Sequence, residues 1–438
     1  MKKKYKNLVP LVLIIFMVAG WYQLNSKAVE THNEYAKYVS EARKYAEIGV
    51  TTYAQANYLK ALQIKESFDL RFELAEYYKK NSNLDTNLEW CEAIQEKYPT
   101  NVKIYDRLLE IYFQAKDYKS CYDTISLAKK RQLSSKYISD TENKIAYEYR
   151  FEQNRTYDDV SAFMDDYCAV KSEDNWGFIN SEGKLIASCQ FKKVSSFSND
   201  NAAVVAQDDS IYFINSEGNK SIATKETKYS EFGMISGGMM TAVSNGKYMY
   251  LKDTFDKLFG DYDFASAMNN VAAVKIGDSW SIIDSNGKNI GTEKYKDVII
   301  DENGYACRRN RLFVRNSDGY VVMLDNQGNK LSNQVFEDAK LFSFDKLAAV
   351  KLEGKWGFVD ENGKQVIKPQ YEDARSFSYG LAAVKDIGKW GFIDNTGNIK
   401  IKAEFYDAKD FNSEGSCFVN IGNTWQLLKL YRNLSSEG

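Results

Sequence analysis

Few residue types in this chain can support catalysis. Its 438 residues include a single histidine, His32, which lies near the N-terminus. A Ser–His–Asp triad and a histidine-containing zinc site both need histidine beside other reactive groups. The sequence also contains no glycine-rich phosphate loop and no nucleophile-elbow motif. Paired carboxylates suffice for glycoside hydrolysis, but the 60 acidic residues single out no pair. We therefore expect a protein that is not an enzyme and uses no cofactor.

Acidic turns offer a second kind of chemistry, the binding of a metal ion. Turns of the form Asp/Asn-x-x-Gly recur at 180–183, 284–287, 325–328, 360–363 and 394–397. Calcium loops also combine spaced Asp and Asn with a sharp glycine turn. Each of these turns supplies at most two carboxylates, however, and its third residue varies. Type I turn chemistry accounts for the pattern, so the sequence predicts no metal site.

Tryptophans recur at one phase of a repeating unit and could stack on sugar rings or fill a core. They are Trp176, Trp280, Trp356, Trp390 and Trp425. Other copies of the unit carry Ile211, Tyr248 and Val321 at this phase. An aliphatic residue fills a core but does not replace a sugar platform, so we interpret the tryptophans as structural. The glycine that follows several of them permits a bulge or the close approach of another backbone.

Lysines recur as well, at the end of the first long strand expected in each unit. Lys171, Lys275, Lys351 and Lys385 would form a basic stripe if the units stack in register. Such a stripe could bind an anionic wall polymer or an acidic partner. The alternative is a solvated face whose charges protect strand edges from pairing.

The repeating unit itself determines the expected fold. Eight copies begin near Tyr157, each with short β-branched and aromatic runs bounded by turn residues. Three or four short strands in each of eight units predict an all-β repeat domain, with a β-propeller favoured over a β-solenoid. The interval between Trp280 and Val321 is longer than the others, which indicates an insertion around Asp301 to Arg315. This variable loop and the lysine-bearing edges are where we expect a ligand to be recognised.

The motif Trp-Gly-Phe-Ile/Val-Asp/Asn-x-x-Gly, recurring in register, resembles the WG-repeat (KWG) family of bacterial β-repeats. The resemblance covers about 157–431, and its clearest copies begin at Trp356 and Trp390. It implies an interaction or cell-surface module, and it carries no catalytic residues over to this chain.

The N-terminus has the pattern of a membrane signal. Lysines at positions 2, 3, 4 and 6 precede an uncharged stretch from Asn7 to Ser26. The flanking charges favour a cytoplasmic N-terminus with the rest of the chain outside. We expect residues 1–28 to be a cytoplasmic basic tip and a single-pass signal anchor, placing the protein at the cell membrane. The alternative is a signal peptide cleaved near Ala28, followed by secretion.

Residues 33–151 have helical periodicity instead. Small and aromatic residues at Gly49, Ala54, Tyr58 and Ala61 recur in a second copy from Tyr105 to Ala128, with a less regular copy between them. This region resembles tetratricopeptide repeats, in which small residues let paired helices pack closely. A generic bundle of helical hairpins is the alternative. The complete chain is therefore expected to be an α+β multidomain protein, with membrane helix, helical region and β-repeat domain in that order.

The composition indicates which classes of partner to expect. The formal net charge is −2, from 58 basic and 60 acidic residues, so nucleic acid is not an expected partner. The six cysteines form no Cys-x-x-Cys pair, and they are interpreted as small buried hydrophobic residues rather than as disulfides. The favoured function is a non-catalytic scaffold that binds proteins at the cell envelope. The alternatives are a module that binds the cell wall or carbohydrate and, less favoured, a glycan-active enzyme.

Overall fold

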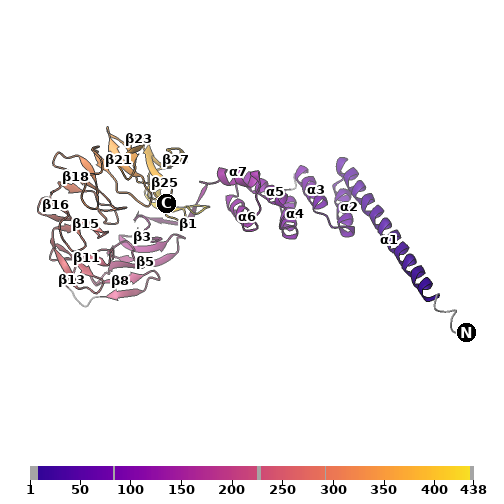
Figure 1. Ribbon diagram of the computed structural model, residues 1–438, viewed down its shortest axis with the longest axis horizontal. Helices are drawn as coiled ribbons and strands as arrows, with labels where there is room; N and C mark the ends of the chain where they lie inside the picture. Colours follow the sequence, from indigo (N-terminus) through magenta and orange to yellow (C-terminus); the bar gives the residue numbers. More distant parts are fainter. Residues whose placement is uncertain (1–7, 82–83, 224–227, 292, 435–438) are drawn as a thin grey trace. The chain divides into compact units, whose positions relative to one another are not determined.

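The computed structural model describes residues 8–81, 84–223, 228–291 and 293–434. The chain divides into two compact units, Met1–Ile145 and Ala146–Gly438. The first is helical and the second consists of β-strands (Figure 1). Each unit is described below by itself.

The helical unit consists of consecutive antiparallel hairpins. Its helices are α1 (Leu8–Glu47), α2 (Thr51–Ile64), α3 (Phe68–Lys80), α4 (Leu84–Lys97), α5 (Val102–Gln114), α6 (Tyr118–Lys130) and α7 (Lys136–Lys144). Helices α3, α5 and α7 begin 34 residues apart, which is the length of a tetratricopeptide repeat. Ser67, Asn101 and Ser135 precede these three helices, and each side chain accepts a hydrogen bond from a backbone N–H of the first turn. Such caps fix where a helix begins.

Small side chains let these helices pack closely. Ala54 and Ala61 of α2 and Ala75 of α3 are completely buried, as is Ala128 of α6. Gly49 differs from the prediction, because it lies in the turn between α1 and α2 with a φ of 74°. Glycine adopts this left-handed conformation without steric strain, so Gly49 allows the turn rather than the helix contact.

No helix in the described part of the chain is long and apolar enough to cross a membrane. The predicted segment from Asn7 to Ser26 falls mostly in α1. The predicted basic tip at residues 1–7 lies outside the described residues.

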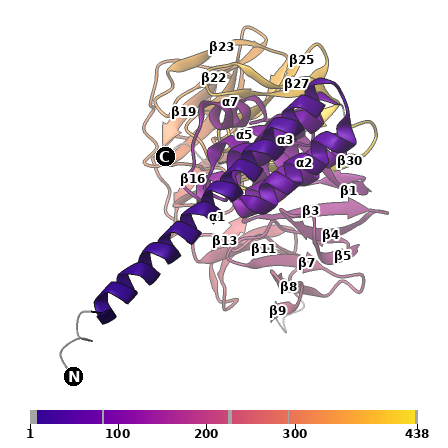
Figure 2. The ribbon, with the colours of Figure 1, turned by 90° about the vertical axis from the view of Figure 1, so that its right-hand side faces the viewer.

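The second unit is an eight-bladed β-propeller, as favoured from the sequence. Eight sheets of three or four antiparallel strands are arranged in a ring (Figures 1 and 2). We name the strands of each blade a to d, from a two-residue strand a outward to strand d. Strands a, b and c of blades 1 to 4 are β2 (Asp159–Val160), β3 (Tyr167–Ser172), β4 (Asn175–Asn180); β6 (Lys193–Val194), β7 (Asn201–Val205), β8 (Ile211–Asn215); β10 (Glu231–Phe232), β11 (Met239–Ser244), β12 (Lys247–Lys252); and β14 (Phe264–Ala265), β15 (Val271–Ile276), β16 (Ser279–Asp284).

Blades 5 to 8 repeat the arrangement. Their strands a, b and c are β17 (Asp297–Val298), β18 (Arg311–Arg315), β19 (Val321–Asp325); β20 (Asp338–Ala339), β21 (Ala348–Leu352), β22 (Lys355–Val359); β24 (Asp373–Ala374), β25 (Leu381–Asp386), β26 (Lys389–Asp394); and β28 (Asp407–Ala408), β29 (Ser416–Asn420), β30 (Trp425–Leu430). Strand d is β5 (Leu185–Phe191), β9 (Lys220–Ala223), β13 (Lys257–Tyr262), β23 (Gln365–Tyr371) and β27 (Ile399–Phe405) in blades 1, 2, 3, 6 and 7.

The ring is closed by a strand from its own beginning. Strand β1 (Tyr149–Tyr157) pairs with β30 and so supplies strand d of blade 8. The sequence-based boundary at 157 lies at the end of this strand, whereas the structural unit begins at Ala146. The difference arises because β1 belongs to the last blade in space but precedes the first repeat in sequence. Without it, β30 would be an unpaired edge.

The glycine of the Trp-Gly motif makes room for strand d. A Cβ atom on Gly391 would lie 2.6 Å from the backbone N of Ala403 and the carbonyl O of Ile401, both in β27. Blades 1 and 6 show the same close approach at Gly177 and Gly357. Blades 4 and 5 have Ser281 and Val322 at this position, and they are the two three-stranded sheets among the described residues. Blades 2, 3 and 8 have Tyr212, Met249 and Gln426 at this position and still have a fourth strand. The glycine is therefore required for the close approach of strand d in blades 1, 6 and 7, but a fourth strand can form without it.

The Asp/Asn-x-x-Gly sequences form the turns between strands c and d. Asp394 shows the common pattern: its Oδ1 accepts hydrogen bonds from the backbone N of Thr396 and of Asn398, each at 3.0 Å. Gly397, the fourth residue, has a φ of 86°. The Asp394 carboxylate thus stabilises the backbone conformation of its own turn.

Candidate functional site

The alternation of strand direction gives the propeller two distinct faces. The turns between strands b and c lie on one face, together with the connections from strand d to the next blade. We call this the hairpin face. The opposite face carries the loops between strands a and b and the turns between c and d, and we call it the loop face. Candidate binding residues occur on both faces.

The predicted lysines all lie near the hairpin face. Lys171, Lys275, Lys351 and Lys385 end strand b of blades 1, 4, 6 and 7 and are half-buried. Arg315 occupies the corresponding position in blade 5, where it pairs with Asp297 across the strands. Arg315 was not predicted from the sequence, because this copy has lost the Trp-Gly signature. Blades 4 to 7 therefore carry a continuous basic arc, which we define as Lys275, Arg315, Lys351 and Lys385.

Carboxylates on strand a lie opposite most of this arc. Asp338 pairs with Lys351 and Asp373 pairs with Lys385 in the strand register. The Arg315 guanidinium is also 3.5 Å from the carboxylate of Asp338 in the next blade. Lys171 lies apart from the arc, and its ammonium is 3.1 Å from the exposed Asp174 carboxylate. The predicted stripe is thus a mixed-charge surface rather than a purely basic one.

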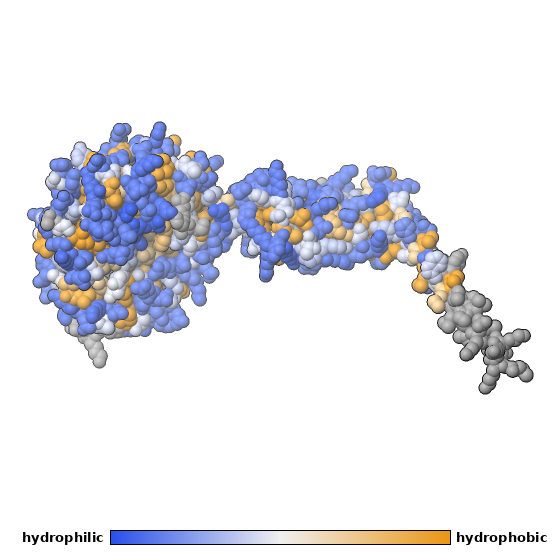
Figure 3. Space-filling view, viewed as in Figure 1, coloured by the Kyte–Doolittle hydropathy of each residue, from blue (hydrophilic) through white to orange (hydrophobic). Residues whose placement is uncertain are grey.

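Apolar side chains project from the turns of the same face. Ile276 is 60% exposed and Ile387 is 86% exposed, in blades 4 and 7. Tyr320 and Ile421, in blades 5 and 8, are also exposed. In the space-filling view, hydrophobic residues occur as separate spots on a mostly hydrophilic surface (Figure 3). Large apolar residues at corresponding turns therefore stand out as candidate contacts.

A repeated hydrogen bond holds several of these turns in place. The Glu372 carboxylate accepts a hydrogen bond from the backbone N of Gly388 at 3.0 Å. Asp263 does the same for Gly277 at 2.7 Å, and Glu337 for Gly354 at about 3.1 Å. Each carboxylate precedes strand a and reaches the b–c turn of its own blade. The exposed Ile276 and Ile387 are thus presented on anchored turns.

A hollow of about 660 Å³ opens beside the basic arc, between blades 4 and 6. Its wall includes Lys275 and Trp280, with Asp263, Asp297 and Asp338 as the acidic groups. The Lys275 ammonium lies 5.7 Å from the centre of the Trp280 ring. The hairpin face therefore combines apolar turn residues, paired charges and a cleft.

The tryptophans lie in strand c of five blades. Trp280, Trp356, Trp390 and Trp425 are buried, whereas Trp176 is half-buried. Basic side chains cover three of the rings: Lys340 lies over Trp356, Arg375 over Trp390 and Lys409 over Trp425, each 5.2–5.5 Å from the ring centre. These cations directly follow strand a in blades 6, 7 and 8, so they line the centre of the ring.

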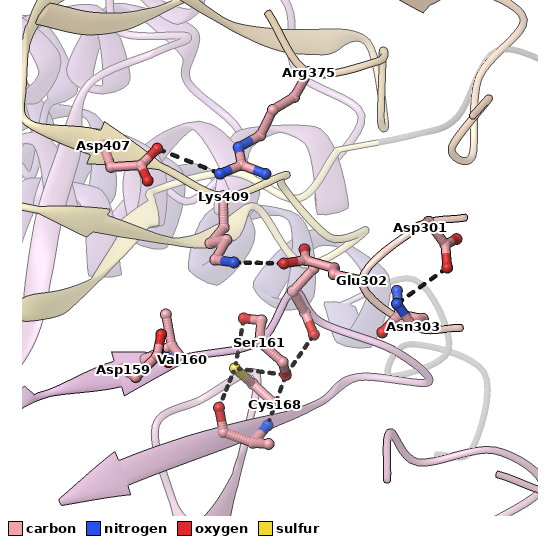
Figure 4. A network of polar contacts seen from close by, with 12 residues as sticks. Asp159, Val160, Ser161, Cys168, Asp301, Glu302, Asn303, Arg375, Asp407 and Lys409 are labelled. Atoms are coloured by element: carbon pink, nitrogen blue, oxygen red, sulfur yellow. Dashed lines mark hydrogen bonds and ion pairs between the residues drawn. The ribbon is translucent and has the colours of Figure 1, made fainter. Parts of the chain in front are cut away.

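The predicted insertion crosses this centre. Residues 299–310 form the loop between strands a and b of blade 5, while Arg311–Arg315 belongs to β18 and is part of the regular blade. Lys409 of blade 8 lies 2.5 Å from Glu302 in this loop (Figure 4). Asn303 accepts a hydrogen bond from Ser196 of blade 2 at 2.7 Å, and the Gly304 carbonyl accepts one from the Ala267 N–H of blade 4. The insertion is thus fixed to several blades around the axis.

Beneath the insertion is a cavity of about 220 Å³, which we call the axial cavity. Its charged lining comprises Asp301, Glu302, Arg308, Lys340, Arg375 and Asp410. Burial alone would raise the pKa of Glu302, but Lys409 and Arg375 hold it below its ordinary value. Burial raises the pKa of Asp410 to about 6, although Arg375 opposes this shift. The surroundings therefore lower the pKa of Glu302 and raise the pKa of Asp410, although both carboxylates line the same cavity.

Neither face assembles a metal centre from the side chains that the structure describes, since no three His, Cys, Asp or Glu residues are placed to share an ion. All six cysteines are free thiols, and all but Cys189 are buried. Burial raises the pKa of Cys121 and Cys168 to about 12. Thiols in this state are poor nucleophiles, so they pack as small apolar side chains.

Comparisons with known proteins bear on the β unit. Four segments match the model for the WG containing repeat: residues 176–209, 323–356, 356–390 and 390–425. No curated protein matched the sequence. The structure is similar to that of BamB from Moraxella catarrhalis, at 11% identity and a TM-score of 0.40, over 64% of this chain and 99% of that one. It is also similar to a eukaryotic initiation factor (12% identity, TM-score 0.42, 65% of this chain and 88% of that one).

Each matched segment begins in strand c of one blade and ends in strand c of the next or, for 176–209, just before it, so the sequence repeat is offset from the structural blade. Residues 210–322 contain no match, and they hold the copies in which Ile211, Tyr248 and Val321 replace tryptophan. The structure nevertheless forms a blade from each of these copies. The chain thus has a helical N-terminal unit, and its propeller contains four segments that match the WG containing repeat.

Proposed function

We propose that this chain is a non-catalytic scaffold at the cell envelope and that the hairpin face of its propeller binds a protein partner. The observation that carries the proposal is the set of exposed apolar side chains on the b–c turns, Ile276, Tyr320, Ile387 and Ile421. Aliphatic and aromatic side chains in the centre of an interface supply most of its binding energy, while charges at the rim set specificity. The basic arc beside these turns favours a partner whose apolar surface is bordered by carboxylates.

The envelope location rests on the N-terminal sequence. Lysines at positions 2, 3, 4 and 6 precede an uncharged, largely apolar segment from Asn7 to Ser26. A signal anchor of this polarity places the following domains outside the cytoplasm. We propose that the helical unit and the propeller are both exported and that the helices supply a second protein-binding surface. Cleavage near Ala28 would release the same two units as a secreted protein.

Cell fractionation tests the location separately from binding. The full chain should remain in the membrane fraction after a high-salt wash, and externally added protease should degrade the propeller in cells with a permeabilised wall. Recovery in the supernatant with a new N-terminus near Ala28 would support secretion instead. Recovery in the cytoplasm with complete protection from protease would contradict both forms of the proposal.

Binding is tested with the full chain and two matched variants. Ile276→Ser combined with Ile387→Ser removes apolar contacts from the hairpin face, whereas Ile399→Ser removes a 67% exposed isoleucine that follows a c–d turn. A partner captured from envelope extract and then purified should bind the parent chain and the Ile399 variant equally. It should bind the double variant roughly tenfold more weakly or worse, the effect of losing contacts of this size.

Three results would contradict this proposal. Binding to purified wall or soluble polysaccharide, with no protein partner, would assign the propeller to carbohydrate recognition. Turnover of a glycan that is lost on substitution of one carboxylate would make the protein an enzyme. Equal loss of binding in the double variant and in the Ile399 variant would show that the hairpin face is not the contact surface.

A further inference from the structure

The axial cavity contains polar groups that the protein itself leaves unpaired. Oδ1 of Asp410 is buried and has no hydrogen-bond partner among the described residues. Lys340 faces the same cavity, and its ammonium contacts the Trp356 ring but pairs with no carboxylate in the part of the chain that the structure describes. A buried acceptor without a donor destabilises the folded state. Such a group in a folded protein calls for an explanation.

The other charges of the cavity are paired within the protein. Arg308 lies 2.8 Å from Asp301, and Lys409 lies 2.5 Å from Glu302. Arg375 donates through Nε to the Ala408 carbonyl, and its Nη2 is 3.3 Å from Asp407 (Figure 4). The cavity is therefore left with one acidic and one basic group, Asp410 and Lys340, and the two do not pair with each other.

The remaining wall has an apolar part, beside the polar side chains of Asn303, Ser343, Ser376 and Ser378. Ile299, Ile300 and Phe344 are half-buried and contribute to the lining. The volume of about 220 Å³ corresponds to roughly seven water molecules at about 30 Å³ each. A ligand that fills it therefore has the size of a single amino acid.

From these features we infer that the axial cavity binds a small zwitterion of the size and chemistry of a free amino acid with an apolar side chain. The anionic group pairs with Lys340, and the ammonium donates to the unpaired oxygen of Asp410. The side chain contacts Ile299, Ile300 and Phe344. This site is distinct from the hairpin face, so it adds a small-molecule ligand to the proposed protein scaffold.

The axial cavity lies next to the hollow of the hairpin face, from which a ligand could enter. Ile299, Ile300 and Lys340 line both the axial cavity and the hollow of the hairpin face. These three side chains therefore separate a chamber under the insertion from an open cleft. A ligand on Lys340 would lie directly behind the surface assigned to the protein partner.

The inference is tested by binding to the full chain. The standard amino acids are screened by thermal shift, and the best is compared by calorimetry with its acid lacking the amino group and its amine lacking the carboxylate. For L-leucine these are 4-methylpentanoate and 3-methylbutylamine. We expect a branched or other apolar amino acid to bind and both analogues to bind roughly tenfold to a hundredfold more weakly, the effect of one lost charge-assisted contact.

Two variants place the ligand in the cavity. Asp410→Asn keeps the size of the side chain and removes the buried charge, and Lys340→Gln removes the unpaired cation. Both should weaken binding of the amino acid by a similar factor, while Lys351→Gln on the hairpin face should leave it unchanged. Circular dichroism checks that each variant is folded. The inference is overturned if no amino acid binds, if the analogues bind as well as the amino acid, or if binding persists in Asp410→Asn.

Discussion

The Lys409 ammonium lies 2.5 Å from the Glu302 carboxylate and so joins blade 8 to the insertion of blade 5. The Lys409 side chain is only 11% exposed, whereas that of Glu302 is 35% exposed because it faces the axial cavity. Lys409 also lies over the Trp425 ring. One charge pair thus ties the loop that crosses the axis to the blade that closes the ring.

Breaking this pair should destabilise the propeller. Glu302→Gln leaves the nearly buried Lys409 ammonium without its carboxylate. We expect the free energy of unfolding to fall by about 1–2 kcal/mol. This is less than for a fully buried ion pair, because solvent reaches Glu302. Combining it with Lys409→Met should recover part of the loss. Denaturant titration of both single variants and the double variant measures the coupling. Asp123→Asn in the exposed Lys119–Asp123 pair is the control and should change stability by less than about 0.5 kcal/mol. A coupling near zero would show that the pair does not hold the insertion.

Stability should depend on pH through Asp410. Its folded pKa of about 6 lies above the ordinary aspartate value, so protonation favours the folded state. The stabilising effect is complete below the unfolded pKa of about 4 and is lost as pH rises through 6. Asp410→Asn should therefore stabilise the protein at pH 8 by about 2–3 kcal/mol and by little at pH 4. Thermal unfolding of the parent and of Asp410→Asn at pH 4 and pH 8, without added amino acids, measures this difference in stability. An Asn variant that is less stable than the parent at pH 8 would contradict the assignment.

The Trp-Gly glycine should tolerate no side chain. Gly391→Val would place Cβ 2.6 Å from the backbone of β27, so strand d must move away. We expect a loss of about 3 kcal/mol or more, at the upper end of overpacking effects. Gly422→Val is the matched control, because a Cβ there has no neighbour within 4 Å. Chemical denaturation of the two variants gives the comparison. Similar stability of both would show that strand d is not held by the glycine.

Closure of the ring should depend on β1. A fragment that begins at Ala146 retains Tyr149–Tyr157 and should unfold cooperatively as a monomer. A fragment that begins at Asp158 lacks the strand that pairs with β30. It should be less stable, or associate through the exposed edge. Limited proteolysis and analytical ultracentrifugation distinguish the two fragments. This role of β1 would be contradicted if the two fragments were equally resistant to the protease and had the same oligomeric state.

Much of the fold was predictable because the repeat is local. The number of units, their hairpins and their glycine turns follow from short-range patterns such as Asp394 to Gly397, whose hydrogen bonds join near neighbours in sequence. Even copies without tryptophan, such as that at Tyr248, could be aligned by their apolar alternation. The predicted start at Tyr157 missed β1, since its partner β30 lies at the opposite end of the chain.

The binding surfaces were predictable only in part. Lys275, Lys351 and Lys385 were identified from their position in the repeat, but Arg315 was missed where the motif is degenerate. The loop after Asp301 was recognised as variable, yet its length alone could not show that it crosses the axis. Asp410 gave no signal in the sequence, because nothing local distinguishes it from other acidic residues.

The sequence by itself determined blades 1 to 7, since each depends on contacts between strands that are close in sequence, whereas the eighth also needs β1 from the start of the unit. Only the tertiary structure decided what those blades enclose. Ring closure brings Glu302, Asp410 and Lys340 from three blades into one cavity, and burial there leaves Oδ1 of Asp410 without a donor among the described residues. The charge state of a side chain depends on its surroundings in space, and a repeat in sequence does not specify which blades will face one another.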